Sequence, residues 1–336
     1  MQRRTLLAGL AALPPAARAQ GIAAPPPGYP DRPISLVVPF TPGGSTDIAA
    51  RVLAERMGQR LAGEGFANAR LIVENRAGAG GSVGSEYVRR AAPDGYTLLV
   101  ATASSHGSNP AALPQTTPYD PVEDFTAISV IGGGPMVLVV PNDSPYRDVA
   151  ALFAALRRPG AHASWATSGA GGIGHLTGEL MLHRAGIAGA EHVPYRGGSA
   201  VMEALAKGEV EFSLEVLATT APHLRDGLSR ALAVSSLRRT PLFPAVPTLD
   251  ESGLRGFDIT TWNVLLGPRG LPPAVAELLS RTANAVLADP AVRERLNTAG
   301  VEPADPGSPA ATRAFLTAEL AKFRGIVAES GLRLSR

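Results

Sequence analysis

The most informative stretch of the sequence is Ile34-Ser35-Leu36-Val37-Val38-Pro39-Phe40-Thr41-Pro42-Gly43-Gly44-Ser45. Its apolar run, residues 34–40, predicts a short buried strand. Apolar residues then recur at helical spacing, at Ile48, Val52, Leu53, Met57 and Leu61. A helix that begins here leaves free backbone N–H groups and the positive end of its dipole where the strand finishes. The stretch therefore predicts an anion site at a strand-to-helix turn.

The same pattern returns, one residue shorter, as Val193-Pro194-Tyr195-Arg196-Gly197-Gly198-Ser199. Each copy joins a strand end, an aromatic residue, a Gly-Gly pair and a serine that we expect to cap the following helix. Because Gly-Gly-Ser is also ordinary turn chemistry, either copy alone is open to a purely structural interpretation. The matching pair favours ligand binding, with one anion site in each of two lobes.

Strands and helices alternate along most of the chain. Further strands are predicted at residues 70–74, 97–101, 125–131, 136–140, 164–167, 192–195, 212–216 and 230–235, and helices at 84–91, 149–156, 173–185 and 200–207. Three helices, each introduced by proline, follow at 272–287, 290–299 and 309–328. This alternation predicts an α/β fold with a mostly parallel sheet and helices on both faces. The last helices are expected to return and pack on the first lobe.

Length and composition are those of a globular chain. The 336 residues, 45% of them hydrophobic, allow about two domains or one large α/β domain. The 37 glycines and 30 prolines predict many tight turns. The absence of cysteine excludes disulfides, thiolate metal sites and cysteine nucleophiles.

The first twenty residues, MQRRTLLAGLAALPPAARAQ, contain the three parts of an export signal. Arg3 and Arg4 precede a short apolar run, and Ala17-Arg18-Ala19 matches a small-x-small cleavage site. We predict a signal peptide at residues 1–19, cleaved after Ala19; an N-terminal amphipathic helix is the alternative. The twin arginine leaves both the general and the twin-arginine export routes open.

Removal of this segment changes the charge balance. The net charge of +2 and the pI of about 9.1 point to nucleic acid as a partner. Cleavage removes three of the 31 basic residues and leaves fewer of them than the 29 acidic residues. No nucleic-acid surface is therefore predicted.

Two further glycine loops carry literal enzyme motifs. Residues 169–174 fit the dinucleotide pattern G-x-G-x-x-G, but Glu191 begins the next strand, whereas a ribose-binding acid lies at the end of its strand. Residues 80–84 fit G-x-S-x-G around Ser82, but a polar stretch at 75–77 separates this motif from its strand, which a nucleophile elbow follows directly. Both enzyme readings remain alternatives to a ligand-binding turn.

Polar loops offer neutral hydrogen bonds and no metal site. Residues 101–109 follow a strand and are rich in hydroxyl groups, which suits either a polar ligand or a solvated turn. The histidines lack metal-ligand spacing, and His175, in the first turn after a glycine loop, is expected near a ligand. We predict no catalytic residue, no metal and no cofactor.

Ordered matches along the mature chain resemble the substrate-binding proteins of tripartite tricarboxylate transporters, the Bug family. The matching residues are Tyr29-Pro30, Pro33-Ile34, 37–47, Ala50-Arg51, 73–81, 93–99, Tyr119-Asp120-Pro121, Asp124-Phe125, His175-Leu176, 192–195, Pro247-Thr248 and Trp262. The resemblance implies a periplasmic protein with the two-lobed, type II periplasmic binding fold and a hinge between two α/β lobes. Lobe 1 is expected at 30–131 and 251–336, and lobe 2 at 132–250.

The resemblance also implies a cleft that closes over a small carboxylate, lined by the loops at 41–47, 101–109, 168–175 and 195–198. The amides of Gly43, Gly44, Gly197 and Gly198 are expected to donate to the carboxylate. The predicted ligand-binding residues are Phe40, Thr41, Gly43, Gly44, Ser45, Asp47, Ser104, Ser105, Asn109, Ser168, Gly169, His175, Tyr195, Arg196, Gly197, Gly198 and Glu215.

Two of these residues bear on selectivity. Arg196 stands where the family usually has lysine, and arginine offers a planar, bidentate carboxylate clamp. Glu215 stands near a position that often faces the far end of the ligand. An acid there would favour an amino group or cation and disfavour a second carboxylate, unless Glu215 merely ends an exposed strand.

The resulting prediction is a monomeric, non-enzymatic periplasmic receptor. It captures a small organic carboxylate and delivers it to the membrane permease subunits of a tripartite tricarboxylate transporter. The alternatives are an exported Rossmann-type, nucleotide-dependent enzyme and a ligand sensor for a signalling kinase.

Overall fold

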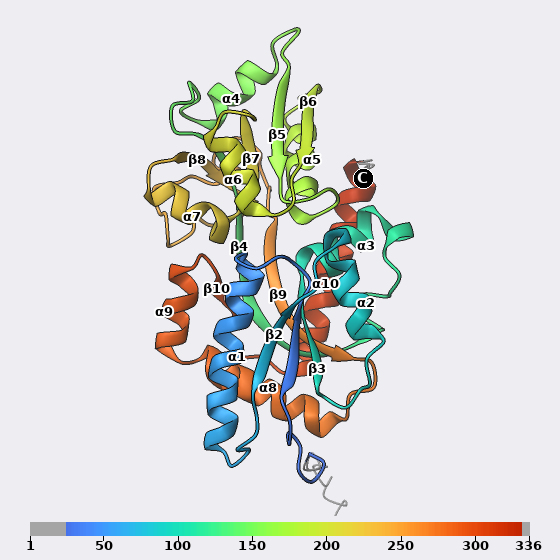
Figure 1. Cartoon of the computed structure of the whole chain (residues 1–336). Coiled ribbons are helices and arrows are strands. Elements are labelled where there is room, and N and C mark those ends of the chain that lie inside the picture. The colour runs from blue at the N-terminus through green and yellow to red at the C-terminus, as the bar shows by residue number, and fades with distance from the viewer. Residues whose placement is uncertain (1–24, 331–336) are drawn as a thin grey trace, which may run out of the picture.

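The structure, a computed structural model, describes residues 25–330. Two lobes lie one above the other in Figure 1, and strands β4 (Phe125–Pro141) and β9 (Thr260–Pro268) run between them. The predicted signal peptide lies outside the described residues. Within those residues, no helix is both long and apolar enough to cross a membrane.

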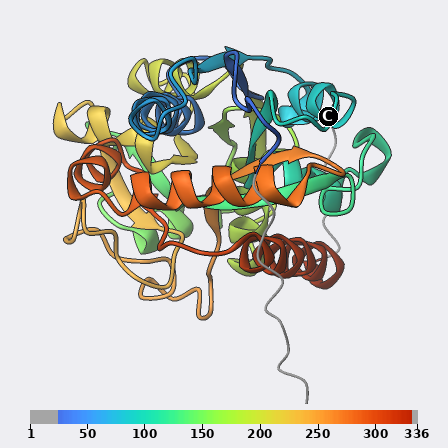
Figure 2. The same ribbon diagram turned by 90° about the horizontal axis from the view of Figure 1, so that it is seen from below.

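The lower lobe is built on a sheet with the strand order β2-β1-β3-β9-β4, and β10 also pairs with β4. Figure 2, a view from below, shows α1 and α10 on opposite sides of this lobe with α8 crossing between them. Its elements are β1 (Ile34–Val38), α1 (Ser45–Gly63), β2 (Leu71–Asn75), η1 (Ala79–Gly81), α2 (Ser82–Arg89), β3 (Thr97–Thr102), η2 (Ser104–Ser108), α3 (Asn109–Ala112), η3 (Pro114–Thr116), α8 (Pro273–Leu287), α9 (Pro290–Thr298), β10 (Glu302–Pro303) and α10 (Pro309–Ser330).

The upper lobe is built on the strands β4-β7-β5-β6, and β8 also pairs with β4. Trp165 and Phe212, both fully buried, stack in its core at a ring-centroid distance of 6.0 Å. Its elements are α4 (Val149–Leu156), β5 (Ala163–Thr167), α5 (Ile173–Arg184), β6 (Ala190–Pro194), α6 (Gly198–Ala206), β7 (Phe212–Val216), α7 (Leu217–Arg225) and β8 (Ser229–Val234).

The sheets are mixed, and the expectation of a mostly parallel sheet is wrong. β1, β2 and β3 are parallel, as are β5, β6 and β7, but β9 is antiparallel to β3 and β4, and β4 is antiparallel to β7 and β8. β4 and β9, the strands that join the lobes, make these antiparallel pairings. The α/β class and the helices on both sides of the sheets are as predicted.

β4 is one strand, whereas the sequence predicted two strands separated at residues 132–135. It passes from pairing with β9 to pairing with β7 between Pro135 and Met136. The glycines there permit close packing, since a Cβ on Gly133 would collide with the carbonyl oxygen of Thr261. This crossing lies near the predicted lobe boundary at 131/132; where the moving bodies divide stays a prediction.

Candidate functional site

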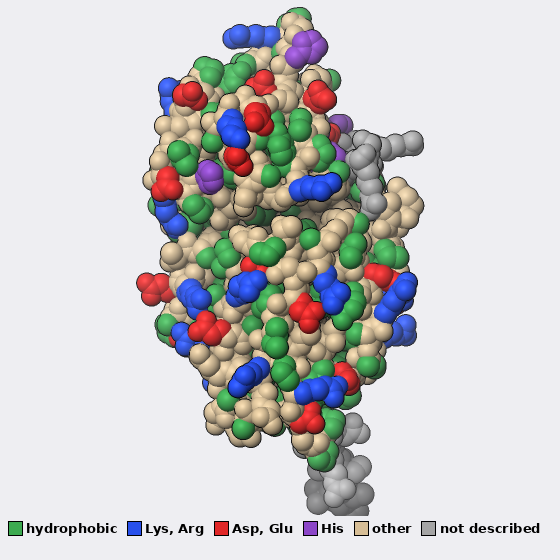
Figure 3. All heavy atoms as spheres, in the orientation of Figure 1, with side chains coloured by type: hydrophobic (Ala, Val, Ile, Leu, Met, Phe, Trp, Pro, Cys, Tyr) green, Lys and Arg blue, Asp and Glu red, His purple; other side chains and the backbone are tan. Residues whose placement is uncertain are grey.

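A cleft runs between the two lobes and is visible as a horizontal groove in Figure 3. It holds two adjoining chambers with volumes of about 260 and about 620 Å³. Their shared wall includes Phe40, Thr41, Ser104, Ser168 and Arg196. We call the smaller one the threonine chamber, because Thr219 and Thr261 close it, and the larger one the glycine chamber, because residues 77–81 close it.

The β1–α1 turn forms the floor of the threonine chamber. Asp47, 4% exposed, lies behind this turn and accepts hydrogen bonds from the Gly43 N–H at 3.0 Å, from Arg51 Nε at 2.9 Å and from Asn75 Nδ2 at 2.9 Å. Burial acts to raise the pKa of Asp47, but these hydrogen bonds outweigh burial and hold it below its usual range. Asp47 therefore fixes the turn as a carboxylate. It accepts the Gly43 N–H, so the expectation that this amide donates to a ligand is wrong, and the amides of Gly44 and Ser45 remain at the start of the helix.

The segment after β3 forms the second wall of the lower lobe. Ser105 is fully buried and accepts a hydrogen bond from the Thr102 N–H at 3.1 Å, so it braces the segment from behind. Ser104 faces the cleft, and its Oγ accepts from the Ile173 N–H of the upper lobe at 3.1 Å. His106 beneath them is fully buried, and burial lowers its pKa to about 3. Ser104 thus satisfies the N-terminus of α5 across the lobe boundary.

The loop between β5 and α5 lines the cleft from above. His175 Nδ1 accepts from the Gly171 N–H at 3.0 Å, and its ring stacks on His192 with centroids 3.7 Å apart. Burial, with a further contribution from His175, lowers the pKa of His192 to about 3, so this ring is neutral at physiological pH. His175 therefore supports the loop from inside the lobe and lines neither chamber.

The β6–α6 turn is the upper counterpart of the β1–α1 turn. Gly197 is the N-cap of α6 with φ +98°, a conformation that favours glycine. A Cβ there would lie 3.0 Å from Thr41 Oγ1 of the lower lobe. The two predicted anion turns thus face each other across the cleft.

The predicted serine caps are wrong. Gly44 and Gly197 occupy the N-cap positions of α1 and α6, and neither helix has a side-chain cap. Ser45 and Ser199 lie inside the first turn, and both line the threonine chamber. Glycine at the N-cap leaves the first amides open to the cleft, because no local hydroxyl covers them.

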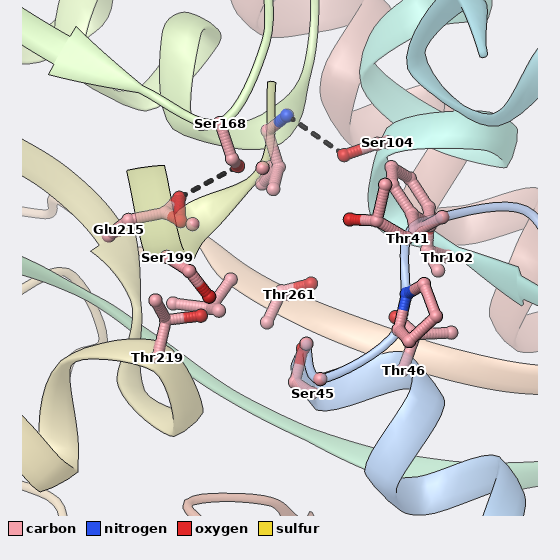
Figure 4. A pocket seen from close by; sticks show the side chains of 18 of the residues that line it. Thr41, Ser45, Thr46, Thr102, Ser104, Ser168, Ser199, Glu215, Thr219 and Thr261 are labelled. Carbon is pink, nitrogen blue, oxygen red and sulfur yellow. Dashed lines mark hydrogen bonds between the residues drawn. The ribbon is translucent and has the colours of Figure 1, made fainter. Parts of the chain in front are cut away.

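Glu215 lies at the end of β7 and is 1% exposed, so the alternative of an exposed strand end is wrong. Ser168 Oγ donates to Glu215 Oε1 at 2.9 Å, as Figure 4 shows. Burial raises the pKa of Glu215 to about 7, although hydrogen bonds from Ser168 and from the backbone of Val216 oppose that rise. The chamber wall therefore contains an acid poised between its neutral and ionised forms.

Hydroxyl groups line the same chamber in Figure 4: Ser199 and Thr219 lie near this acid, and Ser45, Thr46 and Thr261 lie across the cavity. Arg196 and Glu215 are the charged side chains among the residues that line the threonine chamber. No group of three or more carboxylate or imidazole side chains suited to a metal occurs among the described residues. The wall is suited to binding a small polar anion through backbone amides and hydroxyls.

The structure brings most predicted site residues to the cleft, namely Phe40, Thr41, Gly43, Gly44, Ser45, Ser104, Asn109, Ser168, Gly169, Tyr195, Arg196, Gly197, Gly198 and Glu215. Asp47, Ser105 and His175 lie behind the walls. Thr219, Thr261 and the glycines at 78–81 line the cleft and were not predicted. Thr219 follows a predicted strand end, which was a usable signal.

The enzyme readings find no support in the geometry. Ser82 is buried at the first position of α2 and follows η1 instead of a strand, so it does not form a nucleophile elbow. Glu191 is exposed near the start of β6, away from the carboxyl end where a ribose would lie. Both loops serve as glycine turns at helix starts.

A family profile described as "Tripartite tricarboxylate transporter family receptor" matches residues 49–332. The chain belongs to this family. It is a family of solute-binding receptors and not of enzymes, and its members are periplasmic. The resemblance inferred from the sequence motifs is thereby confirmed.

Relatives match over nearly the whole chain. The "Protein BugT" of Bordetella pertussis is 37% identical over 317 residues, which cover 94% of each chain. A solved R. palustris protein with adipate is 32% identical, with a TM-score of 0.84, and covers 91% of this chain and 99% of its own. MatC from Rhodopseudomonas palustris with bound malate is 28% identical, with a TM-score of 0.82, and covers 89% of this chain and 100% of its own. These neighbours confirm the periplasmic binding fold.

Proposed function

We propose that this protein captures a small organic carboxylate in the threonine chamber and delivers it to the permease of a tripartite tricarboxylate transporter. It acts in the periplasm as a monomer, after removal of its signal peptide. Closure of the two lobes over the ligand makes the bound form the one that the permease recognises.

One observation carries this proposal: the β1–α1 and β6–α6 turns face each other across a cavity with little charge. The amides of Gly44 and Ser45 lie across the cavity from those of Gly197 and Gly198, and both helices direct the positive ends of their dipoles toward the cavity. Hydrogen bonds to a charged acceptor contribute about 1.5–3 kcal/mol each. A ligand that engages both turns would hold the lobes together.

The related proteins support a carboxylate as this ligand. Two solved members contain adipate and malate, which are small organic acids. Arg196, exposed at the edge of both chambers, adds a cation that can clamp a carboxylate. We therefore expect the carboxylate to lie between the two turns and beside Arg196.

A thermal-shift screen of the mature protein tests the binding. Mono-, di- and tricarboxylates, amino acids and aromatic acids are compared with nucleotides at equal concentration. At least one carboxylate is expected to raise the Tm, since a ligand at about 100 times its Kd adds about 2.7 kcal/mol to the free energy of unfolding. A nucleotide that raises the Tm while every carboxylate fails would refute the proposal.

Delivery needs a separate measurement in cells. Uptake of the best carboxylate is measured in cells that express the permease subunits with or without this chain. We expect uptake only when both are present. Equal uptake without this chain would assign it a different role, such as ligand sensing.

A further inference from the structure

Glu215 lies directly beside the amides of the β6–α6 turn. A Cβ on Gly198, the first residue of α6, would lie 2.5 Å from Glu215 Oε2 and 2.8 Å from Thr219 Oγ1. The other oxygen, Oε1, is held by Ser168 at 2.9 Å. One oxygen is therefore anchored, while the second lies against the turn that we assign to the carboxylate.

The surroundings of Glu215 leave its charge without a cationic partner in contact. Val137 of β4 pairs with it in the sheet, α6 contributes Gly198 and Ser199, and α7 contributes Thr219. Arg196 lines the same chamber. The imidazoles of the upper lobe, His175 on α5 and His192 on β6, stack on each other behind the loop. Among the described residues Glu215 forms no ion pair, and Ser168 is its side-chain hydrogen-bond partner.

We propose that Glu215 determines ligand selectivity: it favours a carboxylate that carries a hydrogen-bond donor, an ammonium or a hydroxyl, and it disfavours a second carboxylate at that place. This inference rests on the proposed function, because the first carboxylate must occupy the amide turns. A donor group on the ligand can hydrogen-bond to Oε2, which lies beside Gly198 at the chamber wall. A second carboxylate would instead face like charge in a buried chamber, which is strongly unfavourable.

The protonation of Glu215 makes this selectivity dependent on pH. Burial raises the pKa of Glu215 to about 7. An ammonium binds best to the ionised form, so its affinity is expected to increase as the pH rises through 7. A second carboxylate requires the protonated form, so its affinity is expected to decrease over the same range. Ligand carboxyls and amines titrate near 4 and 10, well outside this window.

The experiment measures Kd by calorimetry for sets of linear acids of equal length. Each set has the same chain of three to six carbons and ends in a methyl, a hydroxyl, an ammonium or a second carboxylate. For the wild-type protein at about pH 8, the donor-bearing acids are expected to bind most tightly and the diacid most weakly. E215Q is expected to change the ratio of diacid Kd to amino-acid Kd by about 10-fold or more in favour of the diacid.

E203Q is the matched control, because it removes one negative charge from α6 at an exposed site that pairs with Lys207. It is expected to leave the ratio unchanged. A folded E215Q with the wild-type ratio overturns the inference while the proposed function stands. If E215Q fails to fold, the Kd values of the amino acid and the diacid are measured against pH on the wild-type protein. Kd values that change with pH in the same way for both ligands overturn the inference. If no acid binds the wild-type protein at all, the proposed function fails as well.

Discussion

A proline at position 45 would test whether backbone amides bind the ligand. Ser45 is the first residue of α1, a position where proline is favoured because the N–H has no partner within the helix. Gly44 before it has φ −81° and ψ 171°, the extended conformation that a residue before proline requires. S45P therefore removes one N–H from the cleft and preserves the helix start.

The expected size of the effect follows from the bond that is lost. S45A serves as the reference, since it lacks the same hydroxyl but keeps the N–H. An N–H that donates to a carboxylate contributes about 1.5–3 kcal/mol, so S45P is expected to bind about 10- to 150-fold more weakly than S45A. The free energy of unfolding without ligand should be equal or up to about 1 kcal/mol higher in S45P, because proline restricts the unfolded chain.

Calorimetry with the best acid from the screen gives both Kd values, and thermal unfolding of the free proteins reports the stability. Equal affinity of S45P and S45A would refute the assignment of this amide to the ligand. A large loss of stability in S45P would show instead that the helix start had been disturbed.

Three further outcomes are expected. G197A and G208A both place alanine at a positive φ, and each should lower the free energy of unfolding by about 1 kcal/mol in thermal unfolding. Only G197A should weaken ligand binding, because its methyl group meets the opposite lobe, and equal ligand affinities of the two variants would contradict this. D47N leaves the donors around position 47 without a carboxylate, so it should lower the free energy of unfolding by about 1–3 kcal/mol and weaken ligand binding. Wild-type affinity of D47N in a titration would show that the turn keeps its shape without this carboxylate. Burial lowers the pKa of His106 to about 3, so protonation favours the unfolded chain and the free energy of unfolding should fall as the pH drops below about 6.5. Urea unfolding of H106F should show a smaller fall than the wild-type protein, and H162F, a substitution at an exposed histidine, is the matched control.

The local elements could largely be predicted from sequence, because their signals are local. β7 spans the residues expected of it, β1 begins at the expected residue and ends two residues early, and the glycine turns stand at the starts of α1 and α6. The missed helix α7 contains two threonines and an internal proline, Pro222, which lower its intrinsic helix propensity. Its formation depends on packing that the local sequence does not encode.

The sequence predicts which loops form the cleft, but not which of their polar side chains face it and which support the backbone from behind. A polar residue beside a turn can face the ligand or satisfy the backbone of the turn itself, and both uses favour the same residue types. Asp47, Ser105 and His175 take the second role, each accepting a backbone N–H from a loop of the cleft. Thr261 reaches the chamber through the pairing of β9 with β4, a contact between segments more than a hundred residues apart. Such contacts leave no periodic signal.

The residues that face the cleft and the residues that support its loops from behind have different effects on selectivity. Asp47 and His175 each hydrogen-bond to the backbone of a cleft loop, which orients the loop amides before a ligand binds and reduces the entropy lost on closure. Amides of this kind accept any carboxylate, since they contact only its oxygens. Discrimination between acids therefore depends on side chains in the wall, where Arg196 and Glu215 are the charged residues. Substitution at these two positions should change which acid is bound, whereas substitution of the supporting layer should weaken all acids alike.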